Sequence, residues 1–173
     1  MSEELKYNEP WILQRADPYV YRHTDGNYYF TASIPAYDRI VLRRSKTLAG
    51  LKDAEEVTVW EKHKEGIMSE HIWAPELHYL DDKWYIYFAA DDGNTDNHQI
   101  YVIENDSPDP MQGEFRMKGA IMTNPDWNWG IHPSTFEHKG ELYLLWSGWP
   151  NRRIGSETQC IYIARMENPW TLA

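Results

Sequence analysis

The stretch HIWAPELHYLDDKWYIYFAA, residues 71–90, joins a proline, an apolar–polar alternation, a two-residue turn and an aromatic run. Alternation with a period of two predicts a strand with one face on a core, and the aromatic run predicts a second strand beside it. The same order of features follows Pro18 and Pro133, which lie 57 residues before and 58 residues after Pro75. The chain therefore contains three copies of one antiparallel unit, starting near residues 17, 74 and 132.

Each copy continues with a third strand, expected at 38–45, 98–105 and 159–166, and the first two copies add a weaker fourth strand at 55–60 and 115–122. Hairpin turns are predicted at Asp25-Gly26, Asp81-Asp82 and Lys139-Gly140. Four short antiparallel strands repeated every roughly 40 to 60 residues are typical of β-propeller blades. The sequence therefore predicts an all-β fold, a single partial propeller domain over residues 1–173 with about three four-stranded blades, rather than a sandwich of unrelated hairpins.

Propellers typically have about four to eight blades, so three blades leave sheet faces and edges uncovered. We expect self-association, or a complementary chain that carries the C-terminal blades, to close the arc.

The composition excludes some partners. The formal net charge is −10, and the longest basic runs are the pairs Arg43-Arg44 and Arg152-Arg153, which argues against a nucleic acid. No stretch approaches the roughly 18 apolar residues of a membrane span. Because the N-terminus MSEELKYNEPW has no apolar segment, we expect a cytoplasmic protein without a signal peptide. The 9 Trp and 12 Tyr residues suit both strand packing and stacking on sugars.

Three segments carry a family resemblance: RADPYVYRHTDGNYYFT (15–31), HIWAPELHYLDDKWYIYFAA (71–90) and HPSTFEHKGELYLLWSGW (132–149). In this order and spacing they resemble glycoside hydrolase family 43, five-bladed propeller enzymes that remove arabinofuranose or xylose from plant polysaccharides. The likeness covers essentially the whole chain and is greatest to the exo-acting α-L-arabinofuranosidases, with β-xylosidase as the second possibility. It implies an inverting hydrolase that acts on arabinose- or xylose-containing oligosaccharides and requires no cofactor, while an axial metal ion stays an open question.

The resemblance places the general base at Asp17, at the head of an innermost strand. An inverting glycosidase needs such a carboxylate to activate water, with the acid about 6.5–9.5 Å away across the sugar. The alternative for Asp17 is a structural role, capping a turn before Pro18.

The position before the third repeat proline holds His132, where the family has an aspartate that tunes the acid. A carboxylate there would raise the pKa of a neighbouring acid, whereas an imidazolium would lower it. A neutral His132 could instead orient the acid, bind a sugar hydroxyl, or serve only as a hydrogen-bonding residue. Metal ligation is a further alternative, although no second ligand stands beside it at a characteristic spacing.

The family's acidic glutamate lies in an EGP-type motif of a later blade, and this sequence has no such motif. Glu70 and Glu157 are the available carboxylates, and each is more simply explained as a solvated loop residue. Glu76 in WAPE matches the family and is expected to support the site. The acid is therefore expected from a partner or from further blades.

Three tryptophans are candidates for sugar stacking, because an indole face suits a pentose ring. They are Trp73, Trp129 and Trp149, while Trp84 and Trp146 lie within strands and are expected to pack between blades. His71 could line the pocket or pack beside Trp73. Three functions are thus open: a glycosidase completed by other blades, a propeller assembly that binds pentose oligosaccharides without turnover, and an inactive fragment.

Overall fold

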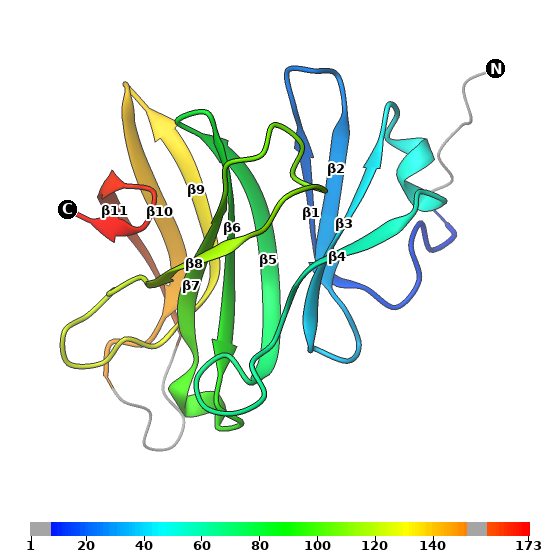
Figure 1. The fold of residues 1–173 in the computed structure, drawn as a ribbon. Helices are drawn as coiled ribbons and strands as arrows, with labels where there is room; N and C mark the ends of the chain where they lie inside the picture. The colour runs from blue at the N-terminus through cyan, green and yellow to red at the C-terminus, as the bar shows by residue number, and fades with distance from the viewer. Residues whose placement is uncertain (1–7, 152–158) are drawn as a thin grey trace.

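The computed structural model describes residues 8–151 and 159–173 and shows three four-stranded antiparallel sheets side by side (Figure 1). Strands that are consecutive in the sequence are neighbours in each sheet. Blade 1 consists of β1 (Ala16–Arg22), β2 (Tyr28–Ser33), β3 (Arg39–Ser45) and β4 (Glu56–Glu61). Blade 2 consists of β5 (Glu70–Leu80), β6 (Lys83–Asp91), β7 (Gln99–Asn105) and β8 (Arg116–Ala120). Blade 3 consists of β9 (Gly130–His138), β10 (Glu141–Gly148), β11 (Cys160–Asn168) and β12 (Thr171–Leu172).

The all-β prediction is confirmed, and the chain forms a partial β-propeller. Helical structure in the described residues is limited to two short 3₁₀ turns, η1 (Ala49–Lys52) and η2 (Thr95–Asn97). Across residues 8–151 and 159–173, none of the helices has the length and apolar character needed to cross a bilayer. One expectation was incomplete, because the third unit also has a fourth strand, the two-residue β12.

The hairpin turns follow from local backbone chemistry. Asp81 and Asp82 both have positive φ angles, 48° and 60°, as do Lys139 and Gly140, at 53° and 78°. Two left-handed residues give the turn whose twist matches that of the flanking strands. The first hairpin has a longer loop, in which the Gly26 amide donates to the His23 carbonyl over 3.0 Å.

The innermost strand of every blade carries a β-bulge at its repeat proline. The register slips by one residue between Ala16 and Tyr19, between Trp73 and Glu76, and opposite Leu145–Ser147 in β9. The residue before each proline is left-handed, with φ of 52° at Asp17, 47° at Ala74 and 50° at His132. A bulge of this kind redirects the side chain of its extra residue. The three bulges thus occupy equivalent places in the three blades.

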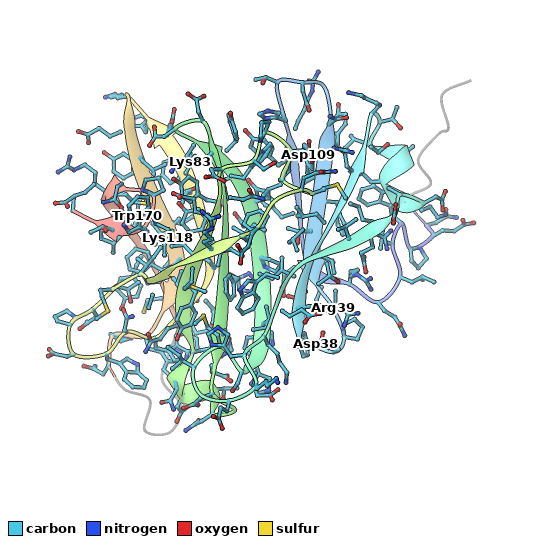
Figure 2. All side chains as sticks on the ribbon, in the orientation of Figure 1. Asp38, Arg39, Lys83, Asp109, Lys118 and Trp170 are labelled. Atoms are coloured by element: carbon cyan, nitrogen blue, oxygen red, sulfur yellow. The ribbon has the colours of Figure 1, made fainter. Side chains whose placement is uncertain are left out.

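Apolar faces pack the blades against one another. One cluster joins Tyr29, Ile40 and Leu42 of blade 1 to blade 2 residues that include Trp84 and Phe88. A second cluster joins Tyr85, Tyr87, Ile100 and Val102 of blade 2 to Leu144 and Trp146 of blade 3. Trp84 and Trp146 are buried, as expected for packing residues. At the outer edge, the Lys118 ammonium lies 3.9 Å from the ring centre of Trp170 and links blades 2 and 3 (Figure 2).

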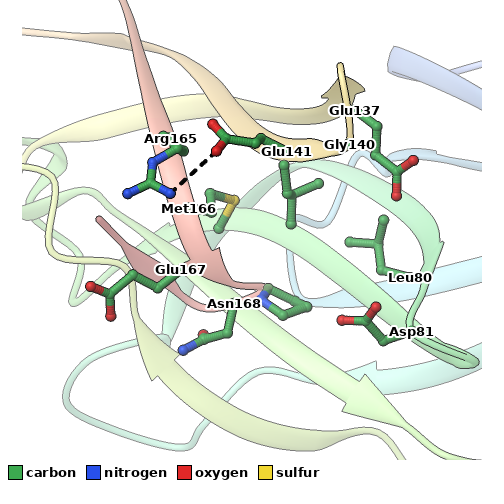
Figure 3. Close-up of a pocket in the computed structure, with 11 residues that line it drawn as sticks. Leu80, Asp81, Glu137, Gly140, Glu141, Arg165, Met166, Glu167 and Asn168 are labelled. Carbon is green, nitrogen blue, oxygen red and sulfur yellow. Dashed lines mark ion pairs between the residues drawn. The ribbon is translucent and has the colours of Figure 1, made fainter.

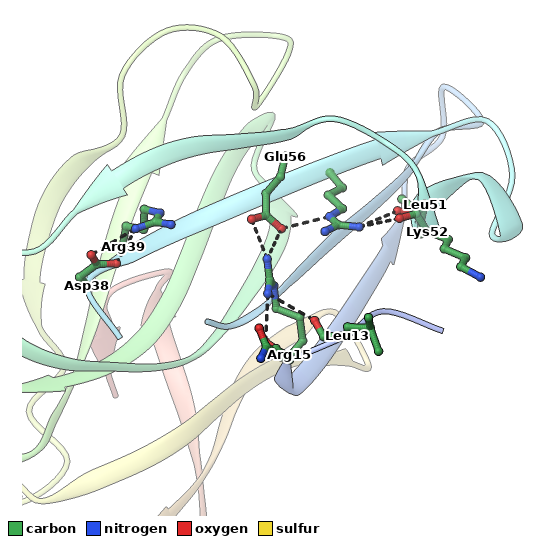
Figure 4. Close-up of polar contacts among 9 residues, drawn as sticks. Leu13, Arg15, Asp38, Arg39, Leu51, Lys52 and Glu56 are labelled. Carbon is green, nitrogen blue, oxygen red and sulfur yellow. Dashed lines mark hydrogen bonds and ion pairs between the residues drawn. The ribbon is translucent and has the colours of Figure 1, made fainter. Parts of the chain in front are cut away.

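The outer face of blade 1 is partly covered by its own chain. Trp11 and Ile12 pack with Phe30, Ala32 and Leu51 on this face. An ion-pair network closes the same region: Arg15 donates two hydrogen bonds, of 2.7 and 2.8 Å, to Glu56, and Arg43 donates one of 3.1 Å (Figure 4). Residues 11–15 are therefore fixed to blade 1 by both apolar and charged contacts.

Replacing Glu56 with Gln should lower the free energy of unfolding at pH 7 by about 1–2 kcal/mol, since it removes charge-assisted hydrogen bonds from two arginines. Burial alone would raise the Glu56 pKa, but the hydrogen bonds from Arg15 and Arg43 outweigh it and lower the pKa. A lowered folded-state pKa gives stability that is present above the unfolded-state value and lost as pH falls through the folded-state value. The difference between parent and variant in urea unfolding should therefore shrink below about pH 4.5. Glu114→Gln, at an exposed ion pair, is the control, and a pH-independent difference for Glu56→Gln would contradict the account.

The outer face of blade 3 is open. Phe136, Leu145, Ile161 and Ile163 are exposed there by 41%, 37%, 72% and 59%. By register, Leu145 and Ile163 correspond to Tyr87 and Val102 of blade 2. Leu145 and Tyr87 each lie 12 residues after the repeat proline of their blade, and Ile163 and Val102 are their partners on the next strand. The blade 2 residues are fully buried against blade 3. The open face is thus equivalent to a face that binds a neighbouring blade elsewhere in the molecule.

Candidate active site

The bulges of blades 1 and 3 bring Asp17 and His132 together. His132 Nε2 lies 3.5 Å from Asp17 Oδ1, and the two side chains are 54% and 30% exposed. The strands that carry them are separated in space by β5, which contacts both β1 and β9. The two residues that the sequence placed at corresponding repeat positions therefore meet where the innermost strands converge.

Asp17 is also held from blade 2. The Ser33 hydroxyl lies 2.7 Å from Asp17 Oδ2, and the Ala74 amide donates to Ser33 Oγ over 2.8 Å. Ser33 is buried at the end of β2, directly opposite Ala16. One carboxylate oxygen of Asp17 is thus fixed by Ser33, and the other faces His132.

This arrangement limits the role of His132. An acid and a base that flank a sugar and an attacking water are about 6.5–9.5 Å apart in inverting glycosidases. His132 Nε2 is only 3.5 Å from Asp17 Oδ1, which is too close for a sugar and a water between them. His132 therefore lies beside the candidate base, in a place where it can orient that carboxylate or contact a substrate.

A histidine–carboxylate cluster lies at the start of blade 2. His71 Nδ1 is 2.9 Å from both Asp91 oxygens, and His98 Nδ1 is 2.7 Å from Asp91 Oδ2. Trp73 stacks on His98 with ring centres 4.3 Å apart and planes at 25°. His71 is 33% exposed, whereas the Asp91 and His98 side chains are fully buried. One face of Trp73 is therefore taken by His98, and His71 is the member of the cluster that reaches solvent.

The electrostatics of this cluster favour a neutral His98. Burial lowers its pKa to about 4, although the Asp91 carboxylate acts in the opposite direction and His71 adds to the lowering. A neutral, buried imidazole beside a carboxylate supports the Trp73 ring without bringing a positive charge into the interior.

Glu76 turns toward its own strand and blade 1. Its Oε2 lies 3.0 Å from His78 Nε2, and the Tyr19 hydroxyl lies 3.5 Å from His78 Nδ1. Burial, followed by the nearby Glu76 charge, raises the pKa of Tyr19, which keeps the phenol protonated. Glu76 therefore belongs to a polar network between the first two blades, and its support of the site stays a prediction.

Trp129 and Trp149 pack on each other. Their ring centres are 3.7 Å apart with planes at 5°, and each is only 5% exposed. Trp127 stacks on the same Trp149 ring at 6.4 Å, and Trp129 Nε1 donates to the Thr95 carbonyl over 2.8 Å. The prediction that these two rings offer open faces to a sugar therefore does not fit this arrangement, because aromatic neighbours cover them.

Of the two remaining candidate carboxylates, the structure describes only Glu70, which does not join Asp17. Glu70 begins β5 and forms a 2.7 Å ion pair with Lys62, while Glu157 lies outside the described residues. Within the part of the chain that the structure describes, no three His, Cys, Asp or Glu side chains are grouped so that they could hold a metal ion.

A pocket of about 320 Å³ lies at the opposite end of blade 3 (Figure 3). It is lined by the Asp81 turn and by Glu137, Glu141 and Glu167, with Arg165 in a 3.6 Å ion pair to Glu141. Its position beside the β9–β10 turn, near the end of β9, separates it from Asp17 and His132, since His132 lies near the start of that strand. It is not part of the candidate site.

Three residues of the site were not identified from the sequence: Ser33, Asp91 and His98. Ser33 ends an aromatic strand, and its partners Asp17 and Ala74 are 16 and 41 residues away. Asp91 and His98 flank the segment DGNTDN, whose composition indicates only a turn. The repeat alignment was the one signal that could have linked these strand ends.

Curated relatives match nearly all of this chain. It is 46% identical over 168 residues to an extracellular exo-α-(1→5)-L-arabinofuranosidase of Streptomyces chartreusis, a match that covers 96% of this chain and 50% of the relative. It is 43% identical to a Streptomyces avermitilis enzyme of the same name, with 99% and 35% covered. The chain thus spans half or less of the length of these relatives.

These names correct one expectation. The N-terminal sequence predicted a cytoplasmic protein, whereas both Streptomyces relatives are named as extracellular enzymes. The predicted location was wrong, because an N-terminus without an apolar segment is weak evidence for where a protein resides.

Solved structures agree with the fold. The crystal structure of an α-L-arabinofuranosidase from Lactobacillus brevis superimposes with a TM-score of 0.86 at 48% identity, over 95% of this chain and 53% of that one. A β-xylosidase/α-arabinofuranosidase from a compost microbial metagenome, solved with xylotriose, shares the fold with a TM-score of 0.70 at 21% identity, over 95% of this chain and 59% of that one. The model of the family described as glycosyl hydrolases family 43 matches residues 7–173. The chain therefore belongs to glycosyl hydrolases family 43.

Proposed function

We propose that this chain is part of an inverting glycosidase that removes arabinofuranosyl residues from plant-derived oligosaccharides, with Asp17 as the general base. The observation that carries the proposal is the place of Asp17: a half-buried carboxylate on a bulge of the innermost strand, with one oxygen bound to Ser33 and the other directed at His132. The names of the relatives support arabinofuranose as the sugar, with xylose as the second choice.

In the proposed reaction Asp17 takes a proton from water as the oxygen attacks the anomeric carbon, while an acid donates a proton to the leaving oxygen. This chemistry needs two carboxyl groups and no organic cofactor. Trp73 and His71, near the start of β5, contribute to sugar binding. Glu76 holds β5 and β1, the innermost strands of blades 2 and 1, in place.

The general acid is proposed to come from another blade. Among the described residues, Glu70 is paired with Lys62 and Glu76 with His78, so neither is placed as a proton donor across a sugar from Asp17. We propose that a further four-stranded blade covers the open face of blade 3, because the equivalent face of blade 2 is covered by blade 3. The relatives, of which this chain spans half or less, are long enough to hold such blades.

The test of the proposed function is an assay of the chain together with the blades proposed to complete it, on aryl α-L-arabinofuranoside and aryl β-D-xyloside, together with calorimetry on arabino-oligosaccharides. Turnover of the arabinofuranoside in preference to the xyloside is the expected result. Binding without turnover of either substrate at any pH would replace the proposal with that of a carbohydrate-binding propeller. Neither binding nor turnover would leave an inactive fragment.

The open face predicts association of the isolated 173-residue chain. Light scattering at rising concentration should give a mass above the 20.5 kDa of one chain, since exposed apolar sheet faces associate. Ile163→Lys should restore the mass of one chain. Ile67→Lys is the matched control, because Ile67 is equally exposed at 59% but lies in the loop before β5. A parent that stays monomeric at every concentration would contradict this prediction.

A further inference from the structure

We propose that Ser33 is a positioning residue for the candidate base, an inference that rests on the proposed function of Asp17. The evidence is a chain of two hydrogen bonds across two blades, from the Ala74 amide to Ser33 Oγ at 2.8 Å and from Ser33 Oγ to Asp17 Oδ2 at 2.7 Å. Ser33 is 2% exposed, so water does not compete for its hydroxyl.

The direction of the second hydrogen bond is fixed by the first. A backbone N–H can only donate, so Ser33 Oγ accepts from Ala74 and has its own proton left to give. The neighbour of that proton is a carboxylate oxygen, which accepts. Ser33 therefore donates to Asp17, and a donated hydrogen bond favours the ionised carboxylate that a general base requires.

The geometry also orients the carboxylate. With Oδ2 bound to Ser33, the plane of the Asp17 carboxyl group is fixed, and Oδ1 is the oxygen left to receive a proton from water. The left-handed backbone at Ala74, with φ of 47°, directs the amide that anchors Ser33. Blade 2 thereby sets the orientation of a catalytic group on blade 1.

The test compares Ser33→Ala with the parent in the active enzyme. Loss of the hydrogen bond should lower kcat about 10-fold with KM changed by less than about twofold, because the ground-state sugar contacts are kept. Thr31→Val is the control: Thr31 lies on the same strand, is fully buried, and its hydroxyl has no hydrogen-bond partner.

A second readout does not depend on turnover. At pH 7 the ¹³C chemical shift of the Asp17 carboxyl group, which responds to a hydrogen bond donated to that carboxylate, should differ between Ser33→Ala and the parent. Ser33→Thr, which keeps the hydroxyl, should behave as the parent, and Ser33→Val, of the same size, should behave as Ser33→Ala. If the smaller alanine destabilises the fold, the comparison of Ser33→Thr with Ser33→Val still shows whether the hydroxyl at this position acts on Asp17.

The outcomes separate the two proposals. An unchanged chemical shift of the Asp17 carboxyl group in both Ser33→Ala and Ser33→Val would overturn the role of Ser33, whatever the activity. A changed chemical shift in a protein that hydrolyses no pentoside would overturn the proposed function and leave the Ser33–Asp17 contact established. A kcat loss of equal size in Thr31→Val would show that the effect is a general disturbance of β2.

Discussion

Replacing Asp17 with Asn should lower kcat by about 10²- to 10⁴-fold, while binding of arabino-oligosaccharides is retained. An amide cannot take a proton from the attacking water. The fold should persist, because Asn tolerates the left-handed backbone at this position, where φ is 52°, better than most residues. Its side-chain oxygen can still accept the hydrogen bond from Ser33.

The chain offers a matched control for this change. Asp81 has the same residue type and a similar φ of 48°, but it lies in the β5–β6 turn, away from His132 and Ser33. Asp81→Asn should therefore keep full activity. Kinetics on an aryl α-L-arabinofuranoside and calorimetry on an arabino-oligosaccharide measure the two quantities. Full activity in Asp17→Asn would show that the base has been assigned to the wrong residue.

The second large effect concerns stability. The unfolding free energy of the chain should fall as pH drops from about 6.5 to about 4, by up to about 3 kcal/mol from His98 alone. The pKa of His98 is lowered to about 4 by burial. Over this pH range the His98 imidazole therefore binds a proton in the unfolded chain but stays neutral in the folded chain. The stabilisation is complete at pH values above the unfolded-state pKa of His98 and decreases as pH falls below that pKa. It is lost once pH is below the folded-state pKa.

A pair of variants isolates this contribution. His98→Gln removes the titrating group, so the slope of stability against pH between 6.5 and 4 should be smaller than in the parent. Asp91 and His71, which lie against His98, stay unchanged in both proteins. His63→Gln, at an exposed loop residue, is the control for the loss of a histidine elsewhere in the chain. Urea unfolding at several pH values measures the slope, and an equal slope in parent and His98→Gln would contradict a neutral, buried His98.

The fold could be predicted from local patterns because each of them has a local cause. Two consecutive turn residues, such as Asp81-Asp82, determine a hairpin, and alternation determines which face of a strand is buried. The bulges were not predictable. A residue before proline is normally extended, so nothing in the sequence indicated left-handed backbone at Asp17, Ala74 and His132.

A site residue could be predicted only where its own position in the sequence indicated its role. The family resemblance placed the base at Asp17, and the repeat put that residue at the head of an innermost strand. The pairing of Trp129 with Trp149 could not, because an indole that packs and one that binds sugar have the same composition, and partners 20 residues apart were needed to tell them apart. Ser33 and Asp91 were missed for the same reason, as their roles depend on contacts between blades.

The most direct test of the central claim, that Asp17 activates water in an inverting hydrolysis, is the configuration of the first product. Proton NMR recorded during hydrolysis of an α-L-arabinofuranoside distinguishes the two anomers before they interconvert. The account predicts that β-L-arabinofuranose appears first, because water attacks from the face opposite the leaving group. Initial release of the α-anomer would contradict it, since retention requires a carboxylate nucleophile and a covalent intermediate in place of a base.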